Sequence, residues 1–263
     1  KPSDPDAAIR GLRQAVQAGR ISLKRIEDSA RRILAAKYDL GLVRQRLTPI
    51  EQIDRLLSDP DVVAFANEVA EQAITLIRND AGLLPISLKP DGKIFNLAIT
   101  NGDDRLVIAT PFSEEMRRRG RRIETLVLDA RSSEEEIRQA LRLAQEAGLV
   151  IVSLYGRVRS GESRSVGIPE SSARALAELI KRDVPLVGIS FGNPYLLQSF
   201  PRLQTYLVAY GDMPSLQEAA ARALLGQANI TGRLPITLPR LYPRGTGLQL
   251  KASAQKTRVN HAP

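Results

Sequence analysis

The sequence lacks most of the residue types on which enzyme active sites are commonly built. It has no cysteine, and its single histidine, His261, lies two residues from the end. Without cysteine there is no disulfide bond, thiolate nucleophile or cysteine-bound metal. A Ser-His-Asp triad or a histidine-bound metal has no suitable histidine, and the sequence has neither a P-loop nor a dinucleotide-binding glycine motif. We therefore expect no metal and no other cofactor.

Aromatic residues and long apolar runs are also scarce, which narrows the choice of partners. Aromatic residues make up 4% of the chain and leave little for stacking on nucleobases. No apolar run approaches the roughly 20 residues of a membrane-spanning helix. The net charge of +9 comes from residues 1–48 (+6) and 240–263 (+5), whereas residues 49–239 carry −2. Solvated basic ends explain this distribution best, so we expect neither a nucleic-acid partner nor a membrane span.

Residues 148–195 show the clearest structural pattern. Two runs rich in valine, isoleucine and leucine, at 149–155 and 184–191, are bounded by glycine or proline, as buried strands are. Between them, apolar residues recur at helical spacing: Ala173, Leu176, Ala177 and Ile180. A strand, a crossover helix and a second strand make a βαβ unit, which predicts two parallel strands in one sheet.

Strands and single helices alternate along most of the chain. Strands are expected at residues 95–100, 123–129, 149–155, 184–191 and 204–210, with an edge strand at 232–239. Further helices are expected at 112–119, 133–146 and 214–225, the second of them opened by a Ser-x-x-Glu capping box. This alternation predicts an α/β fold, with a doubly wound, mainly parallel sheet between two layers of helices.

The chain before this sheet is expected to be helical. Apolar spacing predicts one helix at 6–18 and a second from Ser22, together a helical hairpin, and then a polar linker at 44–58. A further helix is expected from Ser58, with Pro60 in its first turn and Ile77 on its apolar side. The sandwich domain then covers 59–240. The basic tail, 241–263, is expected to be held loosely.

An open α/β sheet places its ligands at the loops that follow the carboxyl ends of its parallel strands. In the loop at 156–167, Arg157, Arg159 and Arg164 are candidates for binding an anionic or polyhydroxyl ligand, with a solvated basic loop as an equal alternative. Glu162 is the candidate general acid, but neighbouring arginines would lower its pKa, whereas an acid needs a raised one. A solvated carboxylate paired with arginine is the preferred interpretation of Glu162.

Three aspartates follow other strands at the same expected edge. Asp103 and Asp104 follow the strand at 95–100, and Asp212 follows the strand at 204–210. They could face one crevice. Aspartate in such positions ordinarily bonds to its own backbone within a turn, and this is the interpretation we prefer.

Four segments occur in an order that resembles a known family: AIRGLRQAVQAGRISLKRIEDSARRILAAKYDLGL, ANEVAEQAITLIRNDAGLLPI, GISFGNPY and ANITGRLPITLP. Together they resemble the second half of a glycoside hydrolase family 3 enzyme, over about residues 1–240. The resemblance implies a (β/α) barrel upstream of Lys1, of which residues 1–43 are the end, and an active site between barrel and sandwich. It also implies that the aspartate nucleophile lies in the barrel, so that this chain carries no catalytic residue at a matched position.

Within that family, the spelling GNPY and the short stretch after GRLPITLP resemble the β-N-acetylglucosaminidase branch, whose acid is an Asp–His pair in the barrel. The resemblance therefore implies hydrolysis of terminal β-linked N-acetylhexosamine from cell-wall or chitin-derived sugars. The loops at 156–167 and 192–195 would face the barrel mouth. They would bring Arg157, Arg159, Arg164 and Asn193 toward an oligosaccharide or amino-sugar substrate. Two alternatives remain: a β-glucosidase of the same family, whose sandwich domain supplies a glutamate acid, and a non-catalytic α/β module that binds an anionic ligand.

Overall fold

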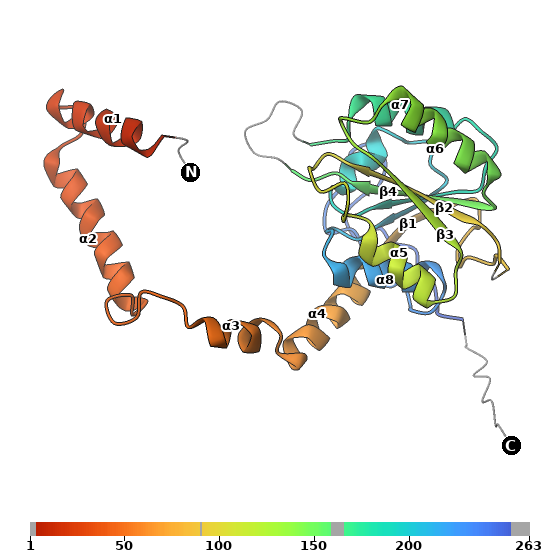
Figure 1. Ribbon diagram of the computed structural model, residues 1–263, viewed down its shortest axis with the longest axis horizontal. Coiled ribbons are helices and arrows are strands. Elements are labelled where there is room, and N and C mark those ends of the chain that lie inside the picture. Colours follow the sequence, from red (N-terminus) through yellow and green to blue (C-terminus); the bar gives the residue numbers. More distant parts are fainter. Residues whose placement is uncertain (1–3, 90, 159–165, 254–263) are drawn as a thin grey trace, which may run out of the picture. The chain divides into compact units, whose positions relative to one another are not determined.

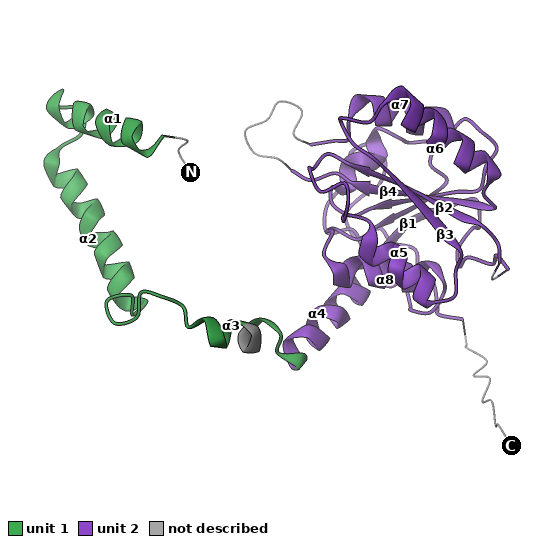
Figure 2. Cartoon of the chain, in the orientation of Figure 1, with its two compact units in different colours: residues 1–60 green, residues 61–263 purple. Residues whose placement is uncertain are grey.

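The computed structural model describes the chain except for residues 1–3, 90, 159–165 and 254–263 (Figure 1). Arg159, Glu162 and Arg164 lie outside the described residues, as does His261. The chain divides into two compact units, residues 1–60 and residues 61–263 (Figure 2).

The first unit is helical. Its helices are α1 (Pro5–Gln17), α2 (Leu23–Asp39) and α3 (Ile50–Leu57). The side chains of Asp4 and Ser22 accept hydrogen bonds from backbone amides in the first turns of α1 and α2, so both helices begin at a capping residue. Large apolar side chains on these two helices are exposed, among them Ile9, Leu12, Ile33 and Leu34. The amphipathic pattern of the sequence thus corresponds to an apolar surface on α1 and α2 that remains exposed among the described residues.

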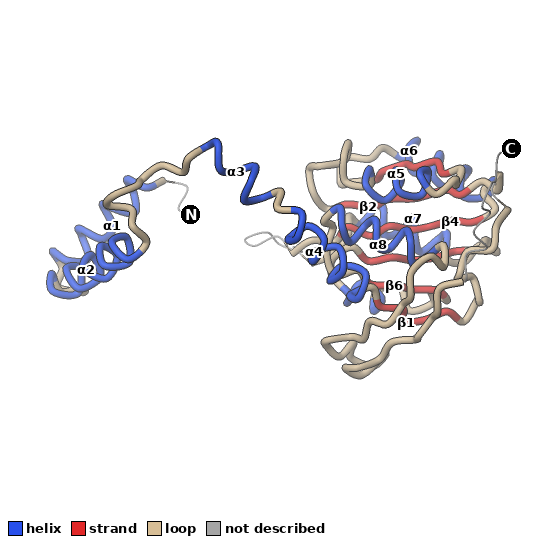
Figure 3. Tube along the Cα trace, turned by 90° about the horizontal axis from the view of Figure 1, so that it is seen from below, coloured by secondary structure: helices blue, strands red, loops and turns tan. Residues whose placement is uncertain are grey.

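The second unit is built on a six-stranded sheet. Its strands are β1 (Thr75–Asn79), β2 (Ile94–Thr100), β3 (Ile123–Leu128), β4 (Leu149–Tyr155), β5 (Leu186–Ser190) and β6 (Thr205–Val208). They lie in the order β1-β6-β5-β4-β2-β3, and Figure 3 shows β1 and β6 at one side of the sheet. β1 is antiparallel to β6, and the other pairs are parallel. The central strands β2 and β4 are buried along their whole length, because both faces of the sheet are covered.

Helices form the outer two layers of the second unit. They are α5 (Thr110–Arg118), α6 (Glu134–Glu146), α7 (Glu170–Leu179) and α8 (Pro214–Leu224), with the 3-10 helix η1 (Pro194–Gln198). The helix α4 (Pro60–Ala73) precedes the sheet and buries Ala70 of its own residues. Figure 1 shows α5 and α8 on one face of the sheet and α6 and α7 on the other. Because successive strand residues point to opposite faces, Ile94 packs in the core with α5 and α8, and Phe95 packs in the core with α6 and α7. No helix in the described part of the chain is long and apolar enough to cross a membrane. The structure confirms the predicted three-layer α/β fold.

One helix is shorter than the sequence pattern predicts. The helix α4 ends at Ala73, and Ile77 lies in β1 instead of on the apolar side of that helix. Residues 74–77 read ITLI, an apolar and mostly β-branched run that suits a strand as well as a buried helix face. Pairing with β6 selects the strand.

The segment at 232–239 is not the edge strand that we predicted. Within the described residues, the one β-bridge of this segment is the isolated bridge between Leu238 and Tyr242. Pro235 and Pro239 have no N–H to donate, so the segment cannot sustain a ladder of hydrogen bonds. The antiparallel edge of the sheet is β1.

The first part of the basic tail is held firmly, contrary to our expectation of a loose extension. The Leu248 amide donates a hydrogen bond of 2.8 Å to the Leu76 carbonyl, on the outer side of β1. Nε of Arg78 donates to the Tyr242 hydroxyl over 2.7 Å. These partners lie far apart in the sequence, so no local pattern indicates that they meet.

Candidate functional site

The parallel strands of the second unit bring several loops to one edge of the sheet. The loops after β2, β4, β5 and β6 begin at this edge, because neighbouring parallel strands end on the same side. The loop at 156–167 follows β4, and Val158 and Val166 form an antiparallel bridge near its two ends. The predictions for Arg159, Glu162 and Arg164 fall on the part of this loop that lies outside the described residues.

Arg157 lies at this edge between two aspartates. Its Nη2 atom is 2.5 Å from a carboxylate oxygen of Asp104, in the loop after β2. Its Nε atom donates over 2.5 Å to Asp212, in the loop after β6, and Nη2 contacts the same carboxylate. Partial burial lowers the pKa of Arg157, but the hydrogen bonds and charges of the two aspartates raise it by more. The guanidinium therefore stays protonated, and the carboxylates of Asp104 and Asp212 balance its positive charge.

Our preferred turn interpretation is wrong for Asp104 and Asp212. Their carboxylates bind Arg157, which lies 53 residues from Asp104 and 55 residues from Asp212 in the sequence. The only sequence signal for this group is that all three residues follow strands of one parallel sheet. Which of those strands lie near one another is decided by the strand order.

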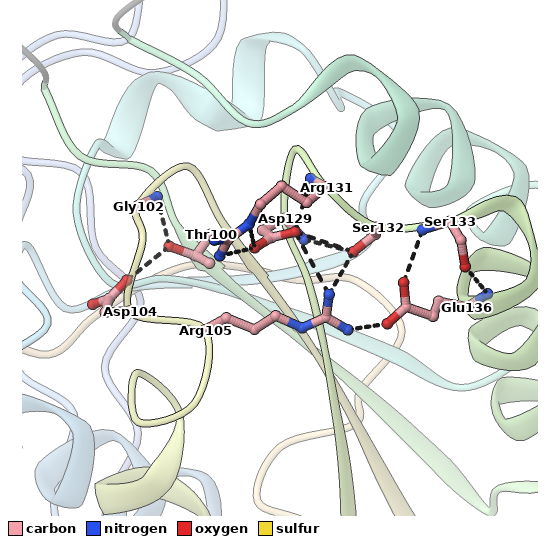
Figure 4. Close-up of polar contacts among 9 residues, drawn as sticks. All are labelled: Thr100, Gly102, Asp104, Arg105, Asp129, Arg131, Ser132, Ser133 and Glu136. Atoms are coloured by element: carbon pink, nitrogen blue, oxygen red, sulfur yellow. Dashed lines mark hydrogen bonds and ion pairs between the residues drawn. The ribbon is translucent and has the colours of Figure 1, made fainter.

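The backbone of Arg157 is held by a residue that the sequence analysis did not single out. Nδ2 of Asn101 donates to the Arg157 carbonyl over 2.8 Å, and Oδ1 of Asn101 accepts from the Arg157 amide over 3.1 Å. Next to Asn101, the Thr100 hydroxyl accepts from the Gly102 amide over 3.0 Å and lies 3.4 Å from Asp104 (Figure 4). Two hydrogen bonds from the Asn101 side chain thus join the loop after β2 to the start of the loop after β4.

The loop after β6 is tied to the protein interior through Gln217 of α8. Nε2 of Gln217 donates to the Asp212 carbonyl over 2.7 Å, and Oε1 accepts from the buried Tyr155 hydroxyl over 3.0 Å. Burial raises the pKa of Tyr155 far above its usual value, so the hydroxyl remains a donor. The Tyr155 ring stacks on Phe191, with centroids 4.9 Å apart. The Tyr155 hydroxyl and the Gln217 side chain therefore form a buried hydrogen-bonded chain that ends at the Asp212 carbonyl.

Asn193, a predicted substrate-binding residue, caps the 3-10 helix η1. Its Oδ1 atom accepts a hydrogen bond of 2.9 Å from the Tyr195 amide. Its carbonyl accepts one of 2.8 Å from the Ser190 hydroxyl at the end of β5. The cap uses the Asn193 side-chain carbonyl, and a substrate contact through its amide nitrogen stays a prediction.

A second group of charged side chains lies where β3 ends (Figure 4). Asp129 is 2% exposed and accepts hydrogen bonds of 3.0 and 2.7 Å from the Arg131 guanidinium and of 2.9 Å from the Arg131 amide. Nη1 of Arg105 lies 3.6 Å from the same carboxylate, and its Nη2 atom pairs with Glu136. Burial raises the pKa of Asp129, but Arg131 and Arg105 together lower it by more, so that it lies below its usual value of 3.8.

We expect Asp129→Asn to lower the free energy of unfolding by about 1–2 kcal/mol at pH 7, because a buried charged acceptor of several hydrogen bonds is lost. A lowered folded-state pKa means that the ionised carboxylate stabilises the fold at pH values above about 4 and loses this effect as the pH falls through the folded-state pKa. Urea unfolding at pH 7 and at pH 3 should show the difference from wild type shrinking at low pH.

The exposed Asp183, before β5, provides the control for this pH dependence, since Asp183→Asn changes the same atoms without that network. If Asp129→Asn lowered the free energy of unfolding by the same amount at pH 7 and at pH 3, the stabilising role of the Asp129 charge would be contradicted. Such a result would show that the effect of the substitution comes from shape and not from charge.

The described part of this edge holds polar groups but not the parts of a glycosidic mechanism. Retaining hydrolysis needs a nucleophile and a general acid with a raised pKa. The pKa values of Asp129 and Glu136 are lowered, and the Arg157 guanidinium bridges Asp104 and Asp212. Over the described ranges, no group of three or more histidine, aspartate or glutamate side chains could hold a metal ion. The geometry suits hydrogen bonding and positioning.

Comparison with known proteins gives consistent matches. The profile of the family described as Glycosyl hydrolase family 3 C-terminal domain matches residues 74–261. The β-N-acetylglucosaminidase/β-glucosidase of Cellulomonas fimi is 26% identical over 243 residues, covering 86% of this chain and 41% of the relative. The periplasmic β-glucosidase of Salmonella typhimurium (strain LT2) is 24% identical over 275 residues, covering 86% and 35%.

A solved structure shares the fold. The glycoside hydrolase family 3 β-N-acetylglucosaminidase from Paenibacillus sp. str. FPU-7 superposes with a TM-score of 0.68 at 23% identity, covering 89% of this chain and 42% of that chain. The chain thus spans about two fifths of the length of the proteins it resembles. The family profile begins where α4 ends and covers the whole sheet. The chain therefore belongs to glycosyl hydrolase family 3, and residues 74–261 match its C-terminal domain.

Proposed function

We propose that this chain is the C-terminal part of a larger hydrolase that removes terminal β-linked N-acetylhexosamine from cell-wall or chitin-derived sugars. The observation that carries the proposal is the similarity to the C. fimi protein, whose name includes β-N-acetylglucosaminidase. The GNPY motif at residues 192–195 supports the same branch of the family. A β-glucosidase is the second candidate, because the Salmonella relative carries that name.

In this proposal the sandwich domain shapes the active site and does not carry the nucleophile. Support comes from the carboxyl edge of the sheet, where Asp104, Asp129 and Asp212 are each bound by arginine. Arg159, Arg164 and Asn193 stay proposed substrate contacts, and Glu162 stays the weak candidate for an acid. The substrate would be held mainly by an upstream barrel domain.

The geometry disfavours a non-catalytic module for an anionic ligand. Such a module would use Arg157 as a free cation, yet two carboxylates already bind this guanidinium. Adding a phosphate or sulfate there would bring a third negative group to one positive charge, which is unfavourable at short range.

The test is hydrolysis of two aryl glycosides by the parent enzyme. We expect kcat/KM for 4-nitrophenyl N-acetyl-β-glucosaminide to exceed that for 4-nitrophenyl β-glucoside by about tenfold or more, because a site built to hydrogen-bond the acetamido group discriminates against its absence. A preference for the glucoside would select the second candidate. Hydrolysis of neither substrate, with salt-sensitive binding of a polyanion by this chain, would favour the binding module.

A further inference from the structure

We propose that Arg157 is a positioning residue, which together with Asp104 and Asp212 holds the start of the loop after β4 and thereby sets the affinity of the parent enzyme for an extended substrate. This rests on the proposed function, since it assigns a role at the same edge of the sheet. It differs from the sequence-based expectation, in which Arg157 touches the substrate itself.

One side chain, that of Arg157, joins three loops. In the sheet order β6-β5-β4-β2, the residue after β4 is next to the loop after β2 but is separated from the loop after β6 by β5. The Arg157 side chain spans this distance and binds Asp104 on one side and Asp212 on the other. An arginine is suited to this task, because its planar group donates in several fixed directions at once.

Both the backbone and the side chain of Arg157 are held by hydrogen bonds. Its backbone amide and carbonyl are both bound by the side chain of Asn101, at 3.1 and 2.8 Å. On the far side, Asp212 is supported by Gln217, which is 2% exposed. The residue therefore has little freedom to turn toward a ligand. A residue with its charge neutralised and its backbone held is better suited to fixing a loop than to binding a substrate.

Gly102 lies close to the side chains of Asp104 and Arg157. A Cβ atom at this position would lie 2.7 Å from Oδ1 of Asp104 and 2.8 Å from Nη1 of Arg157. Both atoms are at the ends of side chains, so Gly102→Ala would push the ion pair apart with little strain on the backbone. The substitution offers a way to disturb the triad (Asp104, Arg157 and Asp212) while every charge is kept.

The two possible roles of Arg157 predict opposite effects of the aspartates. If Arg157 positions the loop, removing either partner disturbs the loop as much as removing Arg157 does. If Arg157 binds substrate directly, removing a competing carboxylate frees the guanidinium and leaves binding unchanged or stronger. The aspartate variants therefore distinguish positioning from direct contact.

The experiment uses the parent enzyme with Arg157→Met, Asp104→Asn, Asp212→Asn and Gly102→Ala, and Asp183→Asn as the control on the exposed loop before β5. For N,N′,N″-triacetylchitotriose we expect each triad variant and Gly102→Ala to raise KM about tenfold with kcat changed less than about twofold. The control should match wild type. The double variant Arg157→Met/Asp212→Asn should be no worse than either single variant, because both remove one shared interaction.

Three outcomes would overturn the inference. An unchanged or lowered KM in the aspartate variants, with a raised KM in Arg157→Met, would show direct contact with substrate. A large loss of kcat at unchanged KM would place the triad in the chemical step. Wild-type values throughout, in an enzyme that hydrolyses the trisaccharide, would show that the triad is only structural. A wild-type enzyme that hydrolyses no N-acetylglucosaminide would instead refute the proposed function, and the inference with it.

Discussion

Purified alone, the 263-residue chain is expected to turn over 4-nitrophenyl N-acetyl-β-glucosaminide at least about 10⁴-fold more slowly than the parent enzyme. A retaining glycosidase places two carboxyl groups about 5 Å apart across the scissile bond, one as nucleophile and one as acid. In the described part of the carboxyl edge, Asp104 and Asp212 come together, but the guanidinium of Arg157 binds both. The two carboxylates therefore face this guanidinium instead of a scissile bond.

The measurement compares initial rates of the chain and the parent enzyme at equal concentration. Because the chain contains a sandwich unit with its own core, we expect it to unfold cooperatively in urea, which shows that inactivity is not a failure to fold. The control variant is Glu162→Gln, which should leave the low rate unchanged. Substantial turnover by the chain that disappears in Glu162→Gln would contradict the prediction and identify Glu162 as a catalytic acid.

The second large effect is expected from Gly192→Ala, which should lower the free energy of unfolding by about 2–3 kcal/mol. Gly192 follows β5, where its backbone passes directly over the end of β4. A Cβ atom at this position would lie 2.6 Å from the Gly156 carbonyl oxygen, which is backbone and cannot move aside alone. The same carbonyl accepts the hydrogen bond of 3.1 Å from the Asn193 amide. The methyl group would therefore separate the loops after β4 and β5.

Urea unfolding of this chain measures the effect, and Gly167→Ala is the matched control. Gly167 lies at the other end of the loop after β4, and among the described residues other than its chain neighbours no heavy atom would lie within 4 Å of a Cβ atom there. The control should stay within about 0.5 kcal/mol of wild type. Equal, small effects of the two substitutions would contradict the close approach of Gly192 to Gly156.

The role of this edge was open to prediction only in part. The loop at 156–167 and its candidate Arg157 are predictable from the sequence, because ligands meet parallel sheets at the carboxyl ends of the strands. From the sequence alone, Asp104 and Asp212 are interpreted as turn residues, and Asn101 shows no signal of a role. Each of these residues is ordinary in its own neighbourhood of the sequence, and only their shared contact with Arg157 distinguishes them.

The sequence by itself determined the class of fold and the N-terminal caps of α2 and α6. Alternating apolar runs and amphipathic helices are local patterns, and the box of Ser133 and Glu136 at the start of α6 forms as the spacing predicts. Burial on both faces of β2 and β4 fits their mainly apolar sequences, IFNLAIT and LVIVSLY. These features depend on residues within one turn or one strand of each other, so the sequence alone is sufficient for them.

Only the tertiary structure decided which segment forms the edge of the sheet and which loops share Arg157. Residues 74–77 suit a helix face or a strand equally well, and the backbone of β6 selects the strand. The tail is held because Leu248 meets Leu76. Arg157 meets Asp104 and Asp212 because the strand order places the ends of β2, β4 and β6 along one edge. Such contacts join residues that are dozens of positions apart, and their free energy depends on the packed sheet that brings them together.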